Sequence, residues 1–163
     1  MLRFISRQPN SYCTSLLDEF KTVDEGSARS HLCFVMPVYG GDARKLVAMR
    51  PTPLQLPLAK RIALHLLRGI AHTHGHGFVH TDVKLDNIFF STTMTADDIE
   101  AWMAKEPSQE CTLETSQGDM LQAAVSQPLP MISEEEAMRV TYVLADFGCG
   151  MCSSIELFQF RYS

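Results

Sequence analysis

Residues 78–90, FVHTDVKLDNIFF, constrain the fold of this chain more than any other segment. The eight residues in its middle include His80, Asp82, Lys84, Asp86 and Asn87. A solvent-exposed loop needs polar residues but no apolar brackets, whereas a buried strand needs the apolar residues without the charges. The segment therefore predicts a loop whose two ends are anchored in a hydrophobic core while its middle does chemistry.

Composition and charge narrow the class of protein. The chain has 163 residues, of which 45% are hydrophobic and 20% charged, which is typical of one globular domain. A net charge of −5 gives no general attraction to nucleic acid or to an anionic membrane, and it mildly favours basic partners. We find no apolar run of transmembrane length and no secretory signal at the start, and the five scattered cysteines suit a reducing compartment. The expected location is intracellular, in the cytoplasm or the nucleus.

The first part of the chain predicts a helix at the start, a hairpin and a long helix. Residues 1–8 suit a helix, and residues 16–23 and 31–39 suit two strands joined by a polar turn. Gly40 and Gly41 are expected to end the second strand, and Asp42 is a suitable N-cap for a following helix. Residues 58–74 have the strongest helical periodicity, with five apolar residues expected on the inner face: Leu58, Ile62, Leu66, Leu67 and Ile70.

The later part of the chain mixes short elements with polar segments. Thr95 is a suitable N-cap for a helix that ends before Pro107, and residues 108–120 are expected to form a loop. Ser133 is a suitable N-cap for a second short helix that starts with three glutamates. The apolar segment that follows predicts a strand ending at Asp146.

Two groups of side chains suggest metal binding only weakly. Cys149 and Cys152 form a single C-x-x-C pair without a second pair or nearby histidine ligands. His72, His74 and His76 alternate at the end of the long helix, where a cap and turn is the better interpretation.

The segment 80–87 and the later Asp146 together suit phosphate chemistry. Asp82 and Asn87 are five positions apart, with Lys84 between them, and Asp146 ends another apolar strand. Carboxylate and amide oxygens that converge suit Mg²⁺, which binds alongside substrate phosphates. A neighbouring lysine supplies positive charge for a transferring phosphoryl group, and a second aspartate can accept the proton of the acceptor hydroxyl.

These residues match two protein-kinase motifs. The segment HTDVKLDN at 80–87 resembles the catalytic loop H-R-D-L-x-x-x-N, and Asp146-Phe147-Gly148 resembles D-F-G. Thr81 replaces the usual arginine, and H-T-D-x-K resembles the serine/arginine-rich protein kinases and their fungal relatives. The resemblance runs from about residue 1 to 148. It implies an α+β fold that is a partial protein-kinase-like fold.

The resemblance also implies how the chain is divided. The chain would begin with residues 1–37 as a remnant of the small lobe, followed by residues 38–90 with the hinge, two helices and the catalytic loop. Residues 91–141 would be a spacer-like insert, residues 142–150 a strand with D-F-G, and residues 151–163 an atypical tail.

Roles follow residue by residue from the resemblance. Asp82 is the catalytic base, and Lys84 contacts the γ-phosphate of ATP. Asn87 and Asp146 hold Mg²⁺.

The adenine site is implied in the same way. The backbone from Pro37 to Tyr39 is the hinge that grips adenine, Met36 is the gatekeeper and Phe89 is the floor, although Phe89 would also suit a plain core position. The arginine that Thr81 replaces normally pairs with a phosphorylated activation loop, so its absence implies activity that does not depend on that phosphorylation.

The sequence departs from an active kinase in what it lacks. It has no G-x-G-x-x-G, no V-A-I-K-like lysine and no A-P-E. We therefore expect a serine/threonine kinase fragment with negligible activity alone, acting on protein substrates that are Arg/Ser-rich in this family. The alternatives are a non-catalytic, pseudokinase-type nucleotide- or protein-binding module, and an unrelated α/β phosphate-binding protein, against which the missing P-loop counts. The oligomeric state stays open.

Overall fold

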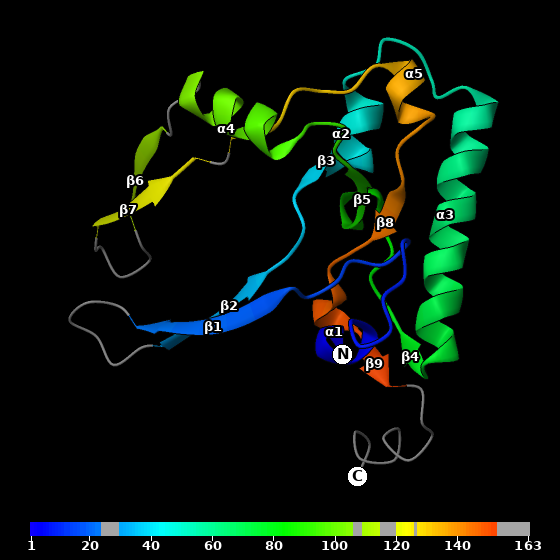
Figure 1. The fold of residues 1–163 in the computed structure, drawn as a ribbon, viewed down its shortest axis with the longest axis horizontal. Helices are drawn as coiled ribbons and strands as arrows, with labels where there is room; N and C mark the ends of the chain where they lie inside the picture. The colour runs from blue at the N-terminus through cyan, green and yellow to red at the C-terminus, as the bar shows by residue number, and fades with distance from the viewer. Residues whose placement is uncertain (24–29, 106–108, 115–119, 126, 153–163) are drawn as a thin grey trace.

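The computed structural model describes residues 1–23, 30–105, 109–114, 120–125 and 127–152. It shows the expected α+β architecture, with a body built around one long helix and a small sheet, and with two hairpins that extend away from that body (Figure 1). The polar turn predicted at 24–30 lies almost wholly outside the described residues.

The sheet at the centre of the body has three antiparallel strands in the order β3-β5-β8. They are β3 (Tyr39–Asp42), β5 (Ile88–Ser91) and β8 (Tyr142–Leu144). In the register, Phe89 lies opposite Asp42 on one side and opposite Val143 on the other. The loop 80–87 leads into β5, and Asp146 follows the neighbouring strand β8, so the sheet joins two segments that more than 50 residues separate in sequence.

The glycine pair 40–41 lies inside strand β3, so the prediction that these glycines end a strand is wrong. A Cβ atom on Gly40 would come within 2.7 Å of the ring of Phe90, and Gly41 has φ +149°. The absence of a side chain lets the buried ring of Phe90 lie against the backbone of β3. A bulge between Tyr39 and Gly41 accompanies this close approach.

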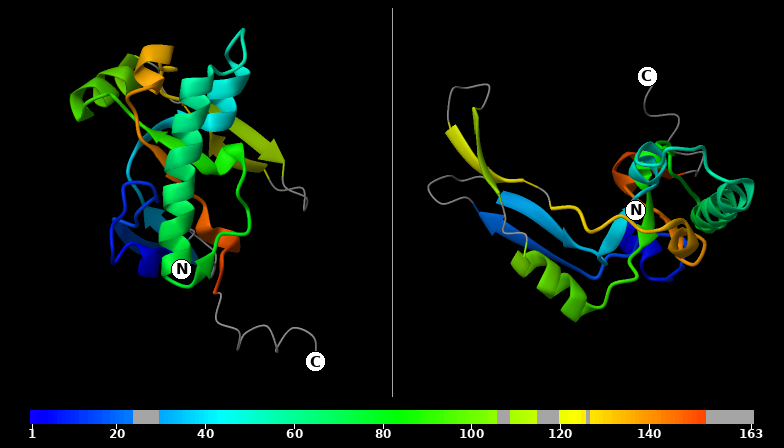
Figure 2. Two further views of the ribbon diagram at one scale, coloured as in Figure 1. Left: turned by 90° about the vertical axis from the view of Figure 1, so that its right-hand side faces the viewer. Right: turned by 90° about the horizontal axis from the view of Figure 1, so that it is seen from above.

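Helix α3 (Leu56–Gly75) covers the sheet and packs against β8 (Figure 2). Its inner face is formed by residues at helical spacing that include Leu58, Ile62, His65 and Gly69. Leu67 is 62% exposed, so its predicted place on the inner face is wrong. None of the helices in the described part of the chain has the length and apolar character needed to cross a membrane.

The short helices α2 (Ala43–Ala48) and α5 (Glu134–Ala137) begin at the predicted caps. The Asp42 carboxylate accepts a 2.8 Å hydrogen bond from the Lys45 N–H. Ser133 and Glu136 form a reciprocal capping box. Their buried residues Ala43, Leu46 and Ala137 join a cluster with Phe90 and Tyr142.

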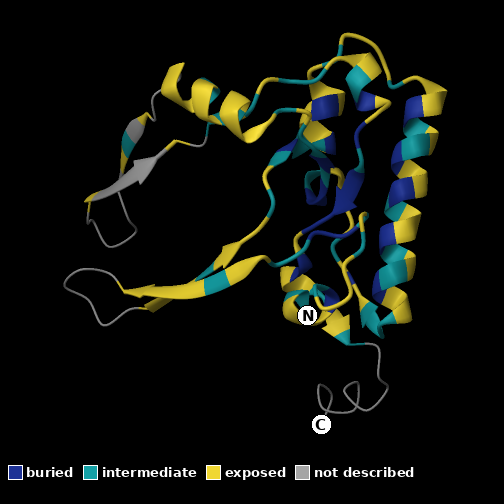
Figure 3. Ribbon diagram, in the orientation of Figure 1, coloured by how far each residue is buried: buried dark blue, intermediate teal, exposed yellow. Residues whose placement is uncertain are grey.

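Two arms lie on the side of the body opposite α3 (Figures 1 and 2). The first is the predicted hairpin of β1 (Asp18–Val23) and β2 (Ser30–Val35). The second comprises α4 (Ala96–Lys105) and the antiparallel strands β6 (Glu110–Glu114) and β7 (Met120–Ala124). The loop predicted for 108–120 is therefore wrong for its described residues, because backbone pairing here overrides a polar sequence. Figure 3 shows α4 and the first hairpin as mainly exposed and β8 as buried.

Small elements complete the lower end of the body. Helix α1 (Leu2–Ile5) buries Ile5 against Leu144 and Phe147. Strand β4 (Phe78–Val79) pairs with β9 (Met151–Cys152) in an antiparallel ribbon. Two 3₁₀ turns overlap the two predicted motifs: η1 (Leu85–Asn87) forms the end of the segment 80–87, and η2 (Phe147–Cys149) begins directly after Asp146.

Candidate nucleotide and phosphate site

The loop at 80–87 is anchored through a buried histidine. His80 is 2% exposed, and its Nε2 lies 2.8 Å from the carbonyl oxygen of Ala145. Its Nδ1 accepts a 3.3 Å hydrogen bond from the Asp82 N–H. Because a carbonyl can only accept and a backbone N–H can only donate, Nε2 carries the proton in this arrangement. His80 thereby joins the loop to the residue that precedes Asp146.

Asp82, Lys84 and Asn87 form one hydrogen-bonded group. Lys84 Nζ lies 2.7 Å from Asp82 Oδ2, and Asn87 Nδ2 donates at 2.9 Å to the same oxygen and at 2.9 Å to the Asp82 carbonyl. The hydrogen bond from Lys84, followed by that from Asn87, holds the pKa of the Asp82 carboxyl below its usual range. The same hydrogen bond raises the pKa of Lys84. Asp82 is thus an ionised acceptor and Lys84 a cation at neutral pH.

Asp146 follows strand β8 and is exposed. It has a left-handed backbone with φ +58°, and its Oδ1 accepts a 3.3 Å hydrogen bond from the Gly148 N–H. Thr81 has φ +66°, and these are the two non-glycine residues with positive φ in the described part of the chain. Such backbone strain costs about 1–3 kcal/mol per residue and persists where surrounding contacts impose it, often at functional sites.

A cavity of about 490 Å³ brings four of the predicted site residues together. Met36, Asn87, Phe89 and Asp146 all line it. Its volume lies within the usual range for small-molecule sites. The other lining residues are Met1, Leu2, Thr14, Phe34, Ala145, Phe147 and Gly148.

Sequence reasoning missed Thr14 in this cavity wall. The Thr14 N–H donates to the Leu144 carbonyl at 2.9 Å, and the Leu144 N–H donates to the Tyr12 carbonyl at 2.8 Å. These bonds place residues 12–14 beside β8 and deliver a hydroxyl to the cavity. Only a pairing across some 130 residues reveals this position, so no local pattern could have identified it.

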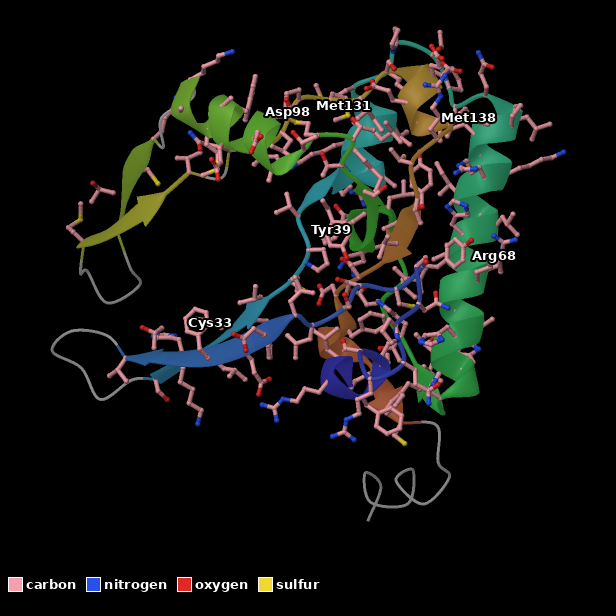
Figure 4. All side chains as sticks on the ribbon, viewed as in Figure 1. Cys33, Tyr39, Arg68, Asp98, Met131 and Met138 are labelled. Carbon is pink, nitrogen blue, oxygen red and sulfur yellow. The ribbon has the colours of Figure 1, made fainter. Side chains whose placement is uncertain are left out.

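The predicted hinge residues lie beside the cavity. Pro37 lies in the connection between β2 and β3, and Tyr39 begins β3 (Figure 4). The Tyr39 hydroxyl donates to Thr14 Oγ1 at 2.8 Å, and its ring lies 5.3 Å from that of Phe89. Burial raises the pKa of Tyr39. Tyr39 also lines a second cavity, of about 390 Å³, together with Trp102 of α4.

The side-chain oxygen atoms of Asn87 and Asp146 suit a hard divalent cation. Both side-chain hydrogen bonds of Asn87 use Nδ2, which leaves its amide oxygen for a ligand. Asp146 lines the same cavity. One carboxylate, one amide oxygen and nucleotide phosphates are the kind of ligands that Mg²⁺ takes. Within the described ranges, no group of three or more His, Cys, Asp or Glu side chains forms a separate metal site.

Comparison with known proteins adds a family match. The model of the protein kinase domain family matches residues 10–101, which is more than half of the chain. A crystal structure of a kinase domain superimposes with a TM-score of 0.58 at 16% identity, covering 94% of this chain and 38% of that one. The partial kinase fold expected from the sequence is thus confirmed.

Curated relatives match over shorter segments. Serine/threonine-protein kinase US3 of Human herpesvirus 1 (strain 17) is 33% identical over 60 residues, covering 37% of this chain and 12% of the viral protein. A serine/threonine-protein kinase of Suid herpesvirus 1 (strain Kaplan) is 36% identical over 63 residues, covering 39% of this chain and 19% of the relative. The chain therefore spans less than a fifth of the length of these relatives.

Proposed function

Because this chain belongs to the protein kinase domain family, we propose that it derives from a serine/threonine kinase and binds ATP with Mg²⁺ in the 490 Å³ cavity. The observation that carries the proposal is that Asn87 and Asp146 line one cavity with Met36 and Phe89. The apolar pair suits adenine, and the polar pair suits a metal-bound phosphate chain.

In this proposal the polar residues divide the work of phosphoryl transfer. Asp82 orients the acceptor hydroxyl and accepts its proton, and its low pKa keeps it ionised for that purpose. Lys84 places its charge at the γ-phosphate. Asn87 and Asp146 hold Mg²⁺, which when bound neutralises phosphate charge.

The adenine end uses the segment between β2 and β3. The backbone of Pro37 to Tyr39 supplies hydrogen bonds, Met36 acts as gatekeeper and Phe89 as floor. The contact between the rings of Tyr39 and Phe89 supports a rigid wall there. The same proposal divides the chain into five parts, with boundaries after residues 37, 90, 141 and 150.

The subtype proposed is serine/arginine-rich protein kinase-like. Thr81 in place of arginine supports it, as does an insert at 91–141 between the two motifs. Substrates would then be Arg/Ser-rich proteins met inside the cell, and the net charge of −5 suits basic partners. With no arginine at 81, activity would not await phosphorylation of a neighbouring segment.

The 163-residue polypeptide itself is proposed to turn over substrate negligibly. Its sequence contains no glycine-rich loop, which in kinases covers the phosphates. Positioning and charge stabilisation provide most of the catalysis in phosphoryl transfer. A nucleotide whose phosphates are not covered by such a loop should therefore react at a small fraction of the usual rate.

Two measurements on the 163-residue protein test the proposal. Thermal unfolding with ATP and Mg²⁺ should show stabilisation, about 2.7 kcal/mol at a ligand concentration of 100 Kd, and Asp146→Asn should lose its Mg²⁺-dependent part. Phosphate transfer to an Arg/Ser-rich peptide should not exceed that of Asp82→Asn. The absence of any nucleotide effect on the wild type would refute the binding proposal, and turnover above the Asp82→Asn control would refute the inactivity.

A second candidate is a non-catalytic, pseudokinase-type binding module. The apolar end of the cavity favours it, because adenine contacts alone suffice for such a role. Nucleotide stabilisation that is equal with Mg²⁺ and with EDTA would support this candidate over the first.

A further inference from the structure

Thr81 occupies a backbone conformation that suits its residue type poorly. It is β-branched, and its φ of +66° lies in the left-handed region that such residues rarely enter. The residue is exposed, so burial of its side chain does not hold it there. Some other interaction must therefore favour this conformation.

The hydroxyl of Thr81 supplies that interaction. Its Oγ1 donates a 2.7 Å hydrogen bond to the carbonyl oxygen of Cys149 in η2. On the other side of Asp146, His80 bonds to the Ala145 carbonyl at 2.8 Å. Consecutive residues of one loop thus hold the chain both before and after Asp146, and the pairing of Val79 with Met151 extends this contact.

We propose that Thr81 is a positioning residue whose hydroxyl fixes residues 146–149, and with them the Asp146 carboxylate, against the loop at 80–87. This inference rests on the proposed nucleotide function, because it concerns where Asp146 presents its oxygens. A neutral hydroxyl does this work with a backbone carbonyl as its partner, so no charged group is required. Asp146 itself has a left-handed backbone, which a rigid neighbour on its C-terminal side helps to maintain.

The hydroxyl can be removed without changing the shape of the side chain. Thr81→Val keeps the β-branch and removes the donor, whereas Thr81→Ser keeps the donor and removes the branch. Thr52→Val is the matched control, because Thr52 is exposed in the connection between α2 and α3. All four proteins are used as the full 163-residue chain.

Two readouts separate positioning from general stability. Hydrogen exchange of a peptide covering 145–152 should accelerate about fivefold in Thr81→Val, as expected for one hydrogen bond, while exchange in α3 stays unchanged. The ratio of ATP dissociation constants without and with Mg²⁺ should fall toward one in Thr81→Val. Thr81→Ser and Thr52→Val should match the wild type in both measurements.

Each outcome has one meaning. A wild type that binds no ATP refutes the proposed function, and with it the role of Thr81 in metal binding. If the wild type binds ATP and Thr81→Val keeps both its exchange rate and its Mg²⁺ ratio, only the positioning role is overturned. If Thr81→Val weakens the binding of ATP equally with and without Mg²⁺, the hydroxyl is merely structural and the inference is also overturned.

Discussion

Gly69 lies where α3 meets the chain segment that forms one wall of the cavity. A Cβ atom at this position would come within 2.6 Å of the Tyr12 carbonyl oxygen and 3.2 Å of Leu144 Cβ. The Tyr12 carbonyl accepts the Leu144 N–H, and Thr14, two residues on, lines the cavity. Gly69→Ala therefore tests whether this close packing supports the site.

Two opposite effects decide the result. Alanine in a helix interior is normally favoured over glycine by roughly 0.5–1 kcal/mol. Here the new methyl group meets backbone rather than a flexible side chain, and overpacking of this kind costs about 1–3 kcal/mol. Displacement of the Tyr12 carbonyl weakens a hydrogen bond worth about 1 kcal/mol. The net expectation is a loss of about 2 kcal/mol, which lowers Tm by roughly 4–8 °C at the sensitivity typical of a domain of this size.

The same helix provides the control. A Cβ atom at Gly75, the last residue of α3, would meet nothing within 4 Å, so Gly75→Ala should be neutral or stabilising by up to about 1 kcal/mol. Thermal unfolding followed by circular dichroism measures both variants, and ATP binding should weaken only in Gly69→Ala. If Gly69→Ala were as stable as Gly75→Ala, the packing argument would be wrong.

Three further predictions concern titratable groups. Burial raises the pKa of Tyr142 to about 12, so its phenol should ionise near that pH in a spectrophotometric titration; Tyr142→Phe, which loses a 3.0 Å hydrogen bond to a backbone carbonyl, should cost about 1 kcal/mol of stability in chemical denaturation. Burial also raises the pKa of the Cys13 thiol to about 12, so iodoacetamide at pH 8 should modify the exposed Cys149 and spare Cys13 until the protein unfolds, as read by peptide mass spectrometry. The pKa of Asp82 is lowered mainly by Lys84, so the stability it contributes is present above its unfolded pKa and is lost as the pH falls through the lower folded value. The fall in Tm between pH 5 and 3 should therefore be shallower in Asp82→Asn than in the wild type, and equal slopes would contradict the pairing.

The central part of the site could be predicted because its sequence pattern is local. The apolar residues that follow the polar loop form the largely buried strand β5, and the apolar segment before Asp146 forms β8 as predicted; these two strands lie side by side, whereas Val79 before the loop is exposed. Caps are local too, since Asp42 and Ser133 bond to N–H groups three residues away. In each case the residues that determine the geometry are near neighbours in sequence.

The rest depends on contacts between distant residues. Gly40 lies within a strand because the ring of Phe90, 50 residues later, occupies the space that a side chain at position 40 would fill. Thr14 reaches the cavity only because its backbone pairs with Leu144. Leu67 has the right period for the core, but it projects from the exposed side of α3. Periodicity identifies a helix face and leaves its width undetermined, because only the packed neighbours define that width.

The β1–β2 hairpin has a practical consequence for handling the protein. Within the described residues these strands pair only with each other, and apolar side chains project from both faces, with Phe20 on one and Leu32 and Phe34 on the other. Outer strand edges without a neighbour invite pairing between molecules. The apparent molecular mass measured by light scattering should therefore rise with protein concentration. A charged residue in place of Phe20 should extend the concentration range over which the protein stays monodisperse.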